Sequence, residues 1–523
     1  MPHEVVHLPR GRHQHSKKMA FIIVLTFLAS AFFLIPSVAP DIYYFVDNPE
    51  YVVAINTLGI PHPPGYPVMM LVGKLFSAIC PCGSTTWRLN VLSALLLSLT
   101  TPIVALLLIR LRVTVVVAVA SALLFVGTYY IRSTAISIEI YSFQLFTTAL
   151  FLYVLVRLVE QIDGSNKRNT LWVGLAFGLC VATHPLSVLL TPGLVITFVW
   201  LQITWRSRIF AGLISVFLVA LIYSYLPIRS HQENTFSVVG HYDAFGIFHP
   251  VDLRNINELY AYLSGQQFDS YFFSHGFIPT VKQITEMVTF IGTNYFWVGF
   301  AIGLWGCFLI SRVGKPYLLG WASFFLLPFY FFATYTAPDK FTMLGILHLL
   351  WLYPLAVGLE WLLVDTDSRL SALILGICVI AVFIWNGNQL QTRQDTVLLD
   401  YTKAQIHSFP EDAIVIANWT PALRLMYLQH IYKLRLDLKV INVDGYYYDL
   451  NQLGEYINRQ PVNKNIVVVD PNQLELNVQE IFSVFKMSPI QIHSTLSIPE
   501  EVVRLLNLDH NHDVFIAGYL LQR

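Results

Sequence analysis

Two carboxyl residues, Asp47 and Glu50, follow the first strongly apolar stretch of the chain. Asn48 is a good N-cap and Pro49 suits the first position of a helix, so the pair is expected at a helix N-terminus. The positive end of the helix dipole favours an ionised Asp47. Such a carboxylate can accept a proton from a hydroxyl nucleophile, which makes Asp47 a candidate general base assisted by Glu50. The alternative is that both acids only stabilise the helix start, and the residues alone do not separate the two hypotheses.

The segment that follows, "IPHPPGYP" at 60–67, is stiff because prolines fix φ and extend the residues before them. The helix before it is about ten residues long, too short to cross a membrane. We expect that helix to lie in the outer membrane interface and to end at Gly59 in a left-handed conformation. The rigid turn can hold His62 and Tyr66 beside a site, so both are candidate substrate-binding residues. The alternative for His62 is a hydrogen-bonding residue in a plain connector.

The composition is that of a membrane protein. Of 523 residues, 55% are hydrophobic and only 12% are charged, whereas soluble domains contain roughly a quarter charged residues. The net charge of +0 gives no field that would attract nucleic acid, and the five cysteines suggest no disulfide framework. Most of the chain is therefore expected in lipid.

About eleven apolar runs are long enough, or nearly long enough, to cross a bilayer. They cover residues 19–39, 89–109, 113–131, 138–158, 169–183, 186–204, 209–228, 284–311, 316–335, 341–363 and 370–388. The stretch 66–79 is short and carries Lys74, so we predict an interfacial helix there. The predicted fold class is mostly α, a polytopic transmembrane helical bundle.

Lysine and arginine concentrate in every other connection between these runs, which sets the orientation. We predict a cytoplasmic tail at 1–18 and a transmembrane domain at 19–389, with non-cytoplasmic loops at 40–88 and 229–283. Residues 390–523 then form a domain outside the membrane. The protein is expected to be multi-pass, in a bacterial inner or plasma membrane.

The C-terminal 390–523 segment differs in composition from the rest. Short apolar strands alternate with helical patterns there, and the strands are "AIVIANW" (413–419), "DLKVINVD" (437–444), "NIVVVD" (465–470), "PIQIHS" (489–494) and "DVFIAGYLL" (513–521). This alternation predicts a small α/β domain with a largely parallel sheet. It has no glycine-rich phosphate loop, so no nucleotide cofactor is expected. Its role is either a folded cap over the membrane part or a contribution to acceptor binding.

Polar residues fall at outer helix ends, on the same side of the membrane as Asp47, among them the His184-Pro185 pair and five charged residues. Charge is costly there and usually has a reason. The five are Arg88, Arg132, Glu139, Arg229 and Lys340. Each alone is typical of an interfacial anchor. Together they could line a polar, anion-binding cavity, so all five are candidate substrate-binding residues.

The block "DNPEYVVAINTLGIPHPPGYPVMMLVGKLF" (47–76) resembles the signature of a family of polytopic membrane proteins in the GT-C glycosyltransferase superfamily. That signature combines an Asp-x-x-Glu pair, a Leu-Gly-x-x-His-Pro-Pro-Gly-Tyr-Pro segment and a Gly-x-x-Phe. The family is similar to protein O-mannosyltransferases and includes bacterial members and the animal O-mannosyltransferase of plexin-type receptors. Weaker blocks, such as "WRLNVLSAL" (87–95) and "SIEIYSFQLF" (137–146), extend the resemblance over roughly 19–450.

The sequence departs from the family pattern in two places. Asn48-Pro49 stands where the family more often has Ser-Gly, and "HQENTFSVVG" (231–240) replaces a proline-rich run in the second outer loop. The second departure leaves acceptor specificity open.

The resemblance implies transfer of a sugar, mannose or a similar hexose, from a polyprenyl-phosphate donor to a hydroxyl acceptor on the non-cytoplasmic face. The acceptor could be a protein serine or threonine, a lipid or a glycan, and the displacement would be inverting. By resemblance Asp47 is the general base and Glu50 assists it. Arginine and lysine can neutralise a single phosphate, so no metal is predicted.

Two other classes remain open. A transporter or flippase of lipid-linked sugars would also have many helices with polar ends, although no internal repeat is evident and the acids lie in an outer loop. A non-catalytic sensor or scaffold would use the C-terminal domain to bind a partner.

Overall fold

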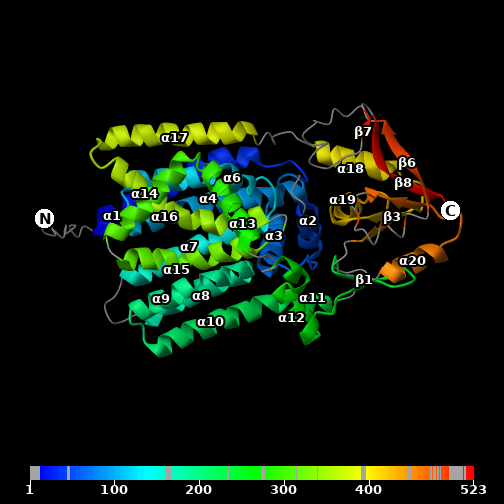
Figure 1. Cartoon of the computed structure of the whole chain (residues 1–523), viewed down its shortest axis with the longest axis horizontal. Coiled ribbons are helices and arrows are strands. Elements are labelled where there is room, and N and C mark those ends of the chain that lie inside the picture. The colour runs from blue at the N-terminus through cyan, green and yellow to red at the C-terminus, as the bar shows by residue number, and fades with distance from the viewer. Residues whose placement is uncertain are drawn as a thin grey trace.

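The computed structural model places a bundle of helices at one end of the molecule and a sheet domain at the other (Figure 1). It describes residues 12–43, 47–160, 167–232, 235–272, 277–313, 315–337, 340–389, 396–443, 450–471, 474, 479, 482, 485–493, 510–511 and 514–522. The predicted domain boundary at 390 and most of the predicted tail at 1–18 lie outside the described residues.

Most helices of the bundle run side by side along the long axis of Figure 1. The bundle helices are α1 (Arg12–Leu34), α4 (Thr85–Arg110), α5 (Val115–Gly127), α7 (Ile140–Glu160), α8 (Lys167–Thr183), α9 (Thr191–Trp200), α10 (Trp205–Tyr223), α13 (Phe277–Asn294), α14 (Val298–Val313), α15 (Lys315–Thr334), α16 (Gly345–Leu362) and α17 (Ser368–Gln389). Further elements at their ends and in the loops are η1 (Ile35–Ser37), α2 (Asn48–Thr57), α3 (Pro67–Ile79), α6 (Tyr129–Ser133), η2 (Pro185–Leu190), α11 (Tyr225–Ser230), α12 (Ile256–Ser264), η3 (Gln266–Tyr271) and η4 (Lys340–Met343).

By length and composition, six described helices could cross a membrane. They are Met19–Ser37, Thr85–Arg110, Ile140–Glu160, Trp205–Ser230, Gly345–Leu362 and Ser368–Gly387. A seventh span is possible if Thr280–Asn294 and Val298–Arg312, which meet at a bend of 107°, act as one. The other predicted spans are helices of 10–17 residues. The multi-pass character is confirmed, but fewer helices reach full length than the sequence predicts, because extended residues such as Thr128 end a helix within an apolar run.

Helix α2 occupies the centre of the molecule rather than its surface. All its residues from Asn48 to Ile55 are buried, and it packs against α3, α4 and the C-terminal helix α19 (Trp419–Tyr427). The C-terminal domain covers the helix, and the interfacial position stays a prediction. Leu58, not Gly59, takes the left-handed conformation that ends α2, with φ of 52°. Gly59 is needed for another reason, since a Cβ there would lie 2.6 Å from the carbonyl oxygen of Phe236.

The C-terminal domain is built on a mixed sheet in the order β4-β3-β5-β8-β6, with β7 paired to β8. The strands are β3 (Ile414–Ala417), β4 (Lys439–Asn442), β5 (Ile466–Val468), β6 (Lys486–His493), β7 (His510–Asn511) and β8 (Val514–Gln522), and its helical elements are α18 (Val397–Ser408), α19, η5 (Leu428–Tyr432) and α20 (Leu450–Arg459). The α/β class is confirmed, and β3, β4 and β5 are parallel as predicted. The sheet as a whole is not largely parallel, because β8 returns antiparallel between β5 and β6.

One hydrophobic core joins the two parts of the molecule. It contains Val52 and Ile55 of α2, Met69 of α3, Leu423 of α19 and Phe515 of β8. A separate core lies within the membrane bundle, and another covers the opposite face of the sheet. Since burial of apolar side chains is the main stabilising term, the shared core fixes the C-terminal domain to the end of the bundle that carries α2 and α3.

Candidate active site

Asp47 stands at the start of α2, but its side chain does not serve the helix. It is the N-cap residue, and among the described residues its carboxylate makes no capping hydrogen bond. Instead Oδ1 accepts a hydrogen bond of 3.1 Å from the indole Nε1 of Trp419. The side chain keeps 27% of its surface exposed. The carboxylate is thus held from one side and open on another, which favours a functional role over helix capping.

Glu50 and His62 form a pair beneath Asp47. The Glu50 side chain is 0% exposed, and its Oε2 lies 2.7 Å from His62 Nδ1. Oε1 of Glu50 also accepts the backbone N–H of His62. Burial raises the pKa of Glu50 above its ordinary value, while the charge and hydrogen bonds of His62 oppose that shift.

The other ring nitrogen of His62, Nε2, faces Asp47 and Tyr66. Nε2 lies 4.0 Å from Asp47 Oδ2 and 3.3 Å from the hydroxyl oxygen of Tyr66. Because a carboxylate can only accept hydrogen bonds, Glu50 favours the tautomer with its proton on Nδ1. Nε2 is then an acceptor beside Asp47. The structure therefore brings four predicted site residues together: Asp47, Glu50, His62 and Tyr66.

The turn that carries His62 is held by the second outer loop and by the end of the membrane helix before it. The Tyr262 hydroxyl donates to the carbonyl of Pro61, and the Tyr225 hydroxyl donates to the carbonyl of Gly59 at 2.7 Å. Gly65 closes the turn by donating its N–H to the His62 carbonyl at 2.9 Å. The peptide bond between Pro63 and Pro64 is cis.

Gly65→Ala is expected to destabilise the protein by about 1–3 kcal/mol, since a side chain strains a left-handed backbone and overpacks its neighbours. Gly65 has φ of +85°, and a Cβ there would lie 2.7 Å from Leu226 Cδ2. Thermal unfolding of the purified protein in detergent measures the loss. Gly212→Ala is the matched control, because nothing lies within 4 Å of a Cβ at that glycine. Equal stability of the two variants would contradict the tight fit of the turn.

Three of the predicted cations, Arg88, Arg132 and Arg229, donate to main-chain carbonyls. Arg229 donates through Nε to the Leu58 carbonyl at 2.5 Å and through Nη2 to the Thr57 carbonyl at 3.2 Å, so it closes the C-terminal end of α2. Arg88 donates to the carbonyls of Ser77 and Cys80, which joins α3 to α4. These contacts give Arg88 and Arg229 structural roles, and neither side chain contacts Asp47, Glu50 or His62 in a described hydrogen bond.

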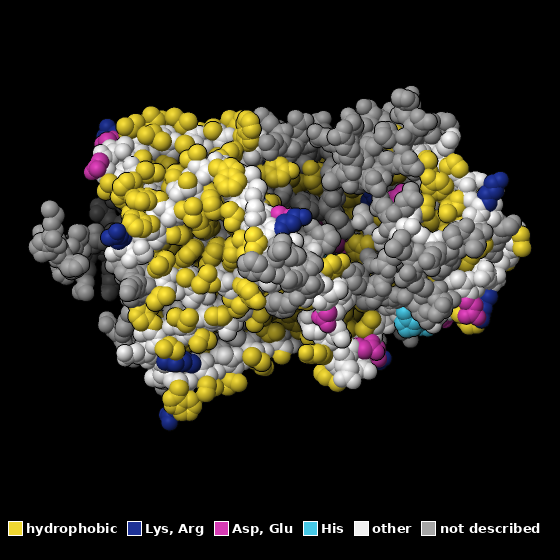
Figure 2. All heavy atoms as spheres, viewed as in Figure 1, with side chains coloured by type: hydrophobic (Ala, Val, Ile, Leu, Met, Phe, Trp, Pro, Cys, Tyr) yellow, Lys and Arg dark blue, Asp and Glu magenta, His cyan; other side chains and the backbone are white. Residues whose placement is uncertain are grey.

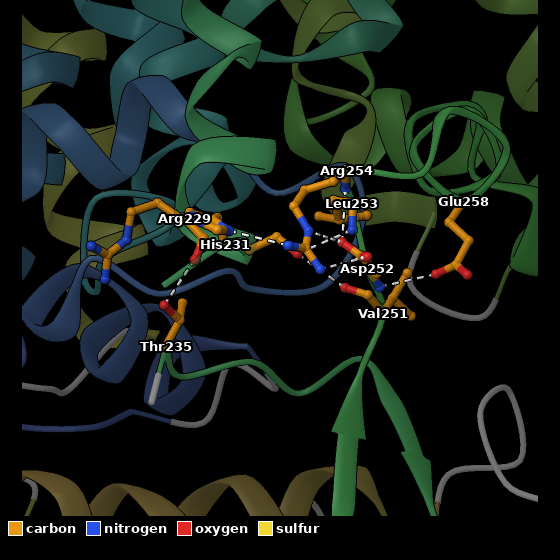
Figure 3. A network of polar contacts seen from close by, with 9 residues as sticks. Arg229, His231, Thr235, Val251, Asp252, Leu253, Arg254 and Glu258 are labelled. Atoms are coloured by element: carbon orange, nitrogen blue, oxygen red, sulfur yellow. Dashed lines mark hydrogen bonds and ion pairs between the residues drawn. The ribbon is translucent and has the colours of Figure 1, made fainter. Parts of the chain in front are cut away.

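The surroundings of Arg229 form a polar network in the second outer loop. Figure 3 shows its guanidinium pointing away from the paired side chains of Asp252 and Arg254. The main-chain carbonyl of Arg229 accepts a hydrogen bond of 2.9 Å from the Thr235 hydroxyl, and Arg254 Nη1 lies 3.1 Å from His231 Nδ1. The network fixes the start of the loop that carries Tyr262 toward the turn around His62.

The remaining predicted residues lie at other helix ends. Lys340 is 2% exposed, and its Nζ has no hydrogen-bond partner among the described residues. Burial lowers the pKa of Lys340. Arg132 donates to the Phe383 carbonyl and to Ser37 Oγ, both at 2.6 Å. Glu139 is buried, and its backbone N–H donates to Ser93 Oγ at 3.2 Å.

A line of polar aromatic residues connects the Lys340 segment with His62. Thr342 donates to the hydroxyl of Tyr141 at 3.0 Å. The rings of Tyr141 and His184 have centroids 6.2 Å apart, and those of His184 and Tyr66 are 5.7 Å apart. Burial, together with the charge of His62, lowers the pKa of His184 to about 3, so this histidine is neutral. Polar groups therefore continue from the site toward η4.

No sequence signal indicated Trp419, which contacts the site, or Asp41, which joins the first loop to the C-terminal domain. Trp419 lies 372 residues from Asp47 in the chain. Asp41 accepts hydrogen bonds from Tyr427 and Tyr432 of the C-terminal domain. His184 did have a signal, as part of a His-Pro pair at an outer helix end.

Asp47, Glu50 and His62 also have the geometry of a cation site. Each offers a ligand atom, and these atoms lie within 4.8 Å of one another. Carboxylate and imidazole are ordinary ligands for divalent metals. In the present arrangement Glu50 accepts both N–H groups of His62, so a metal bound through Nδ1 would have to displace that hydrogen bond.

Solved structures define the class of fold. ArnT from Cupriavidus metallidurans, crystallised with undecaprenyl phosphate, matches with a TM-score of 0.55 and 10% identity, over 97% of this chain and 98% of ArnT. The Archaeoglobus fulgidus oligosaccharyltransferase, tethered to an acceptor peptide, matches with a TM-score of 0.51 and 12% identity, over 82% of this chain and 64% of that one. The protein has an ArnT-like GT-C fold, as its sequence predicted.

Sequence comparison is more specific. Residues 47–207 match the family model described as Protein O-mannosyl-transferase TMEM260 N-terminal domain. The mouse Protein O-mannosyl-transferase TMEM260 is 21% identical over 436 residues, which is 77% of this chain but only 60% of the mouse protein. The chain thus matches less than two thirds of that relative's length. The predicted resemblance to this O-mannosyltransferase family is confirmed, as a distant relation.

Proposed function

We propose that this protein is a GT-C glycosyltransferase that moves mannose or a similar hexose from a polyprenyl-phosphate donor to a hydroxyl group, such as that of a protein serine or threonine, on the non-cytoplasmic face. The observation that carries the proposal is the partly exposed carboxylate of Asp47 beside the buried pair of Glu50 and His62. The similarity to TMEM260 supports mannose and a protein hydroxyl acceptor. ArnT with undecaprenyl phosphate supports a lipid-phosphate donor.

The chemistry follows from this arrangement. Asp47 Oδ2 takes the proton from the acceptor hydroxyl as its oxygen attacks the anomeric carbon. The bond between that carbon and the phosphate oxygen breaks, the polyprenyl phosphate leaves, and the configuration inverts. Nε2 of His62, 4.0 Å from Asp47 Oδ2, then receives the proton and passes it to solvent, which frees both groups for the next turnover.

Lys340 is the strongest candidate to stabilise the departing phosphate. Its buried ammonium has no hydrogen-bond partner among the described residues and lies 5.3 Å from the centroid of the Phe341 ring, so an anionic ligand would satisfy it. Arg132, whose Nε has no partner among the described residues, lies on another outer helix end. Either cation would offset the charge that develops on the phosphate as the sugar leaves.

Lys340→Met is expected to raise the KM for the donor about tenfold, because it removes a charge-assisted hydrogen bond but keeps the length of the side chain. Transfer rates at varied donor concentration measure this change. Lys282→Met is the control, since the Lys282 side chain is 78% exposed. An unchanged donor KM in Lys340→Met would remove Lys340 from the proposed site.

The orientation follows from where the cations gather. Figure 2 shows an apolar surface over the helical part, with several Lys and Arg side chains at the end far from the C-terminal domain. Four arginines lie in the first or last turn of a bundle helix: Arg110, Arg157, Arg206 and Arg312. By the positive-inside rule, this distribution supports a site and a C-terminal domain on the non-cytoplasmic side. A flippase is the alternative, but it would not need a base set beside a buried Glu–His pair.

A direct transfer assay tests the proposed function. Purified protein in nanodiscs is incubated with radiolabelled mannosyl-phosphoryl-undecaprenol and, as acceptor pool, proteins from cells that lack the gene. We expect label in the protein fraction, with and without EDTA. Label that moves across liposome membranes but never leaves the lipid would instead support a flippase. No transfer to protein, lipid or glycan would refute the enzyme.

A further inference from the structure

Trp419 of the C-terminal domain touches the candidate base directly. It is the first residue of α19 and follows strand β3 by one residue. Its indole Nε1 donates to Asp47 Oδ1 at 3.1 Å, and its ring meets His62 edge to face at 5.9 Å between centroids. One side chain from the far end of the sequence therefore contacts both members of the proton path.

The position of Trp419 is fixed by the contacts of its own helix. Asn418 caps α19, with Oδ1 accepting the Trp419 backbone N–H at 2.8 Å. At the other end of the helix, Tyr427 donates to Asp41 Oδ1 at 2.6 Å, and Tyr432 of the following η5 donates to Asp41 Oδ2 at 2.7 Å. Asp41 precedes the segment that leads to Asp47, so α19 is tied to the same outer loop that supplies the base.

The hydrogen bond from Trp419 gives the two carboxylate oxygens of Asp47 different roles. Oδ1 is occupied by the indole N–H, while Oδ2 is the oxygen 4.0 Å from His62 Nε2. A carboxylate otherwise rotates over a broad range about its terminal torsion. With Oδ1 held, Oδ2 stays directed at the acceptor proton and at His62, which is the geometry that proton transfer requires.

We propose that Trp419 is a positioning residue for Asp47 and that the C-terminal domain thereby completes the active site. This inference rests on the proposed function. The domain is then neither a passive cap nor only an acceptor-binding module. Its helix α19 shares a hydrophobic core with α2, and the indole N–H sets which oxygen of Asp47 acts.

The sharpest test changes only the donor atom. Incorporation of 3-benzothienyl-alanine at position 419 replaces the indole N–H with sulfur and keeps the shape of the ring. We expect kcat for mannosyl transfer to fall about 10- to 100-fold, with the donor KM unchanged, because one hydrogen bond to a charged group is lost. Trp419→Phe should show the same split with a similar or larger loss.

The controls separate this proposal from the proposed function and from misfolding. Trp87→Phe changes a tryptophan that packs on Gly83 at the start of α4 and should keep the wild-type kcat. Thermal unfolding confirms that each variant is folded. If the wild type transfers no sugar, the proposed function fails. If the wild type is active and the benzothienyl variant keeps its kcat, the indole N–H does not position Asp47 and this inference alone is overturned.

Discussion

Asp47→Asn is expected to leave the protein folded and to lower kcat for sugar transfer about 100- to 10,000-fold, the range that a general base contributes. Asparagine has the same shape, and its Oδ1 can still accept the N–H of Trp419. Its amide cannot take a proton from the acceptor hydroxyl. Since the lost interaction forms only as the proton moves, the donor KM should change little.

The assay is the transfer of labelled mannose in nanodiscs, with kcat and KM determined from donor concentration series. Asp367→Asn is a matched control, because Asp367 also precedes a helix but does cap it, with Oδ1 accepting the Arg369 N–H at 2.8 Å. Asparagine is an equally good cap, so that variant should keep the wild-type kcat. An Asp47→Asn enzyme with undiminished kcat would remove Asp47 from the chemistry and leave it as a contact of Trp419.

The sequence predicted the parts of this fold that depend on local pattern. Apolar runs located the helices of the bundle, and five short strands in the C-terminal segment were each found within a few residues of their predicted positions. Helix lengths were less predictable, because an apolar run does not show where a backbone leaves the helix, as at Thr128. The position of β8 between β5 and β6 depends on contacts between residues far apart in the sequence, so no local pattern predicts it.

The candidate site divides in the same way. Asp47, Glu50, His62 and Tyr66 lie within twenty residues of one another and were found together. The predicted cations were chosen by topology, which gives the side of the membrane but not the partner. Arg229 therefore proved to bond the carbonyls at the end of α2. Trp419 could not be found, because only the folded C-terminal domain brings it to Asp47.

Glu50→Gln is expected to lower kcat by a similar factor, roughly 100- to 10,000-fold, through the tautomer of His62. Glu50 accepts the proton-bearing Nδ1 of His62 at 2.7 Å. A glutamine whose Oε1 keeps the backbone N–H of His62 presents its NH₂ group to Nδ1. Nδ1 must then accept, the proton moves to Nε2, and the nitrogen beside Asp47 can no longer receive a proton.

The same substitution has a distinct signature in stability. Burial raises the pKa of Glu50, so the carboxyl is more easily kept protonated in the folded state than in the unfolded one. The protonated Glu50 carboxyl contributes fully to the free energy of unfolding below its pKa in the unfolded chain. That contribution is lost as the pH rises through its pKa in the folded protein. Glutamine has no such loss, so Glu50→Gln should gain stability relative to the wild type as pH increases.

Thermal unfolding across pH and transfer kinetics on the same preparations measure both effects. Glu258→Gln is the matched control, because Glu258 is exposed and its carboxylate also accepts a backbone N–H, that of Asp252 at 2.9 Å. A Glu50→Gln protein that is stable but nearly inactive would show that this buried carboxylate is kept for catalysis and not for folding. If the variant is instead unstable at every pH and fully active per folded molecule, Glu50 is a structural partner of His62 and the proton path ends at Asp47.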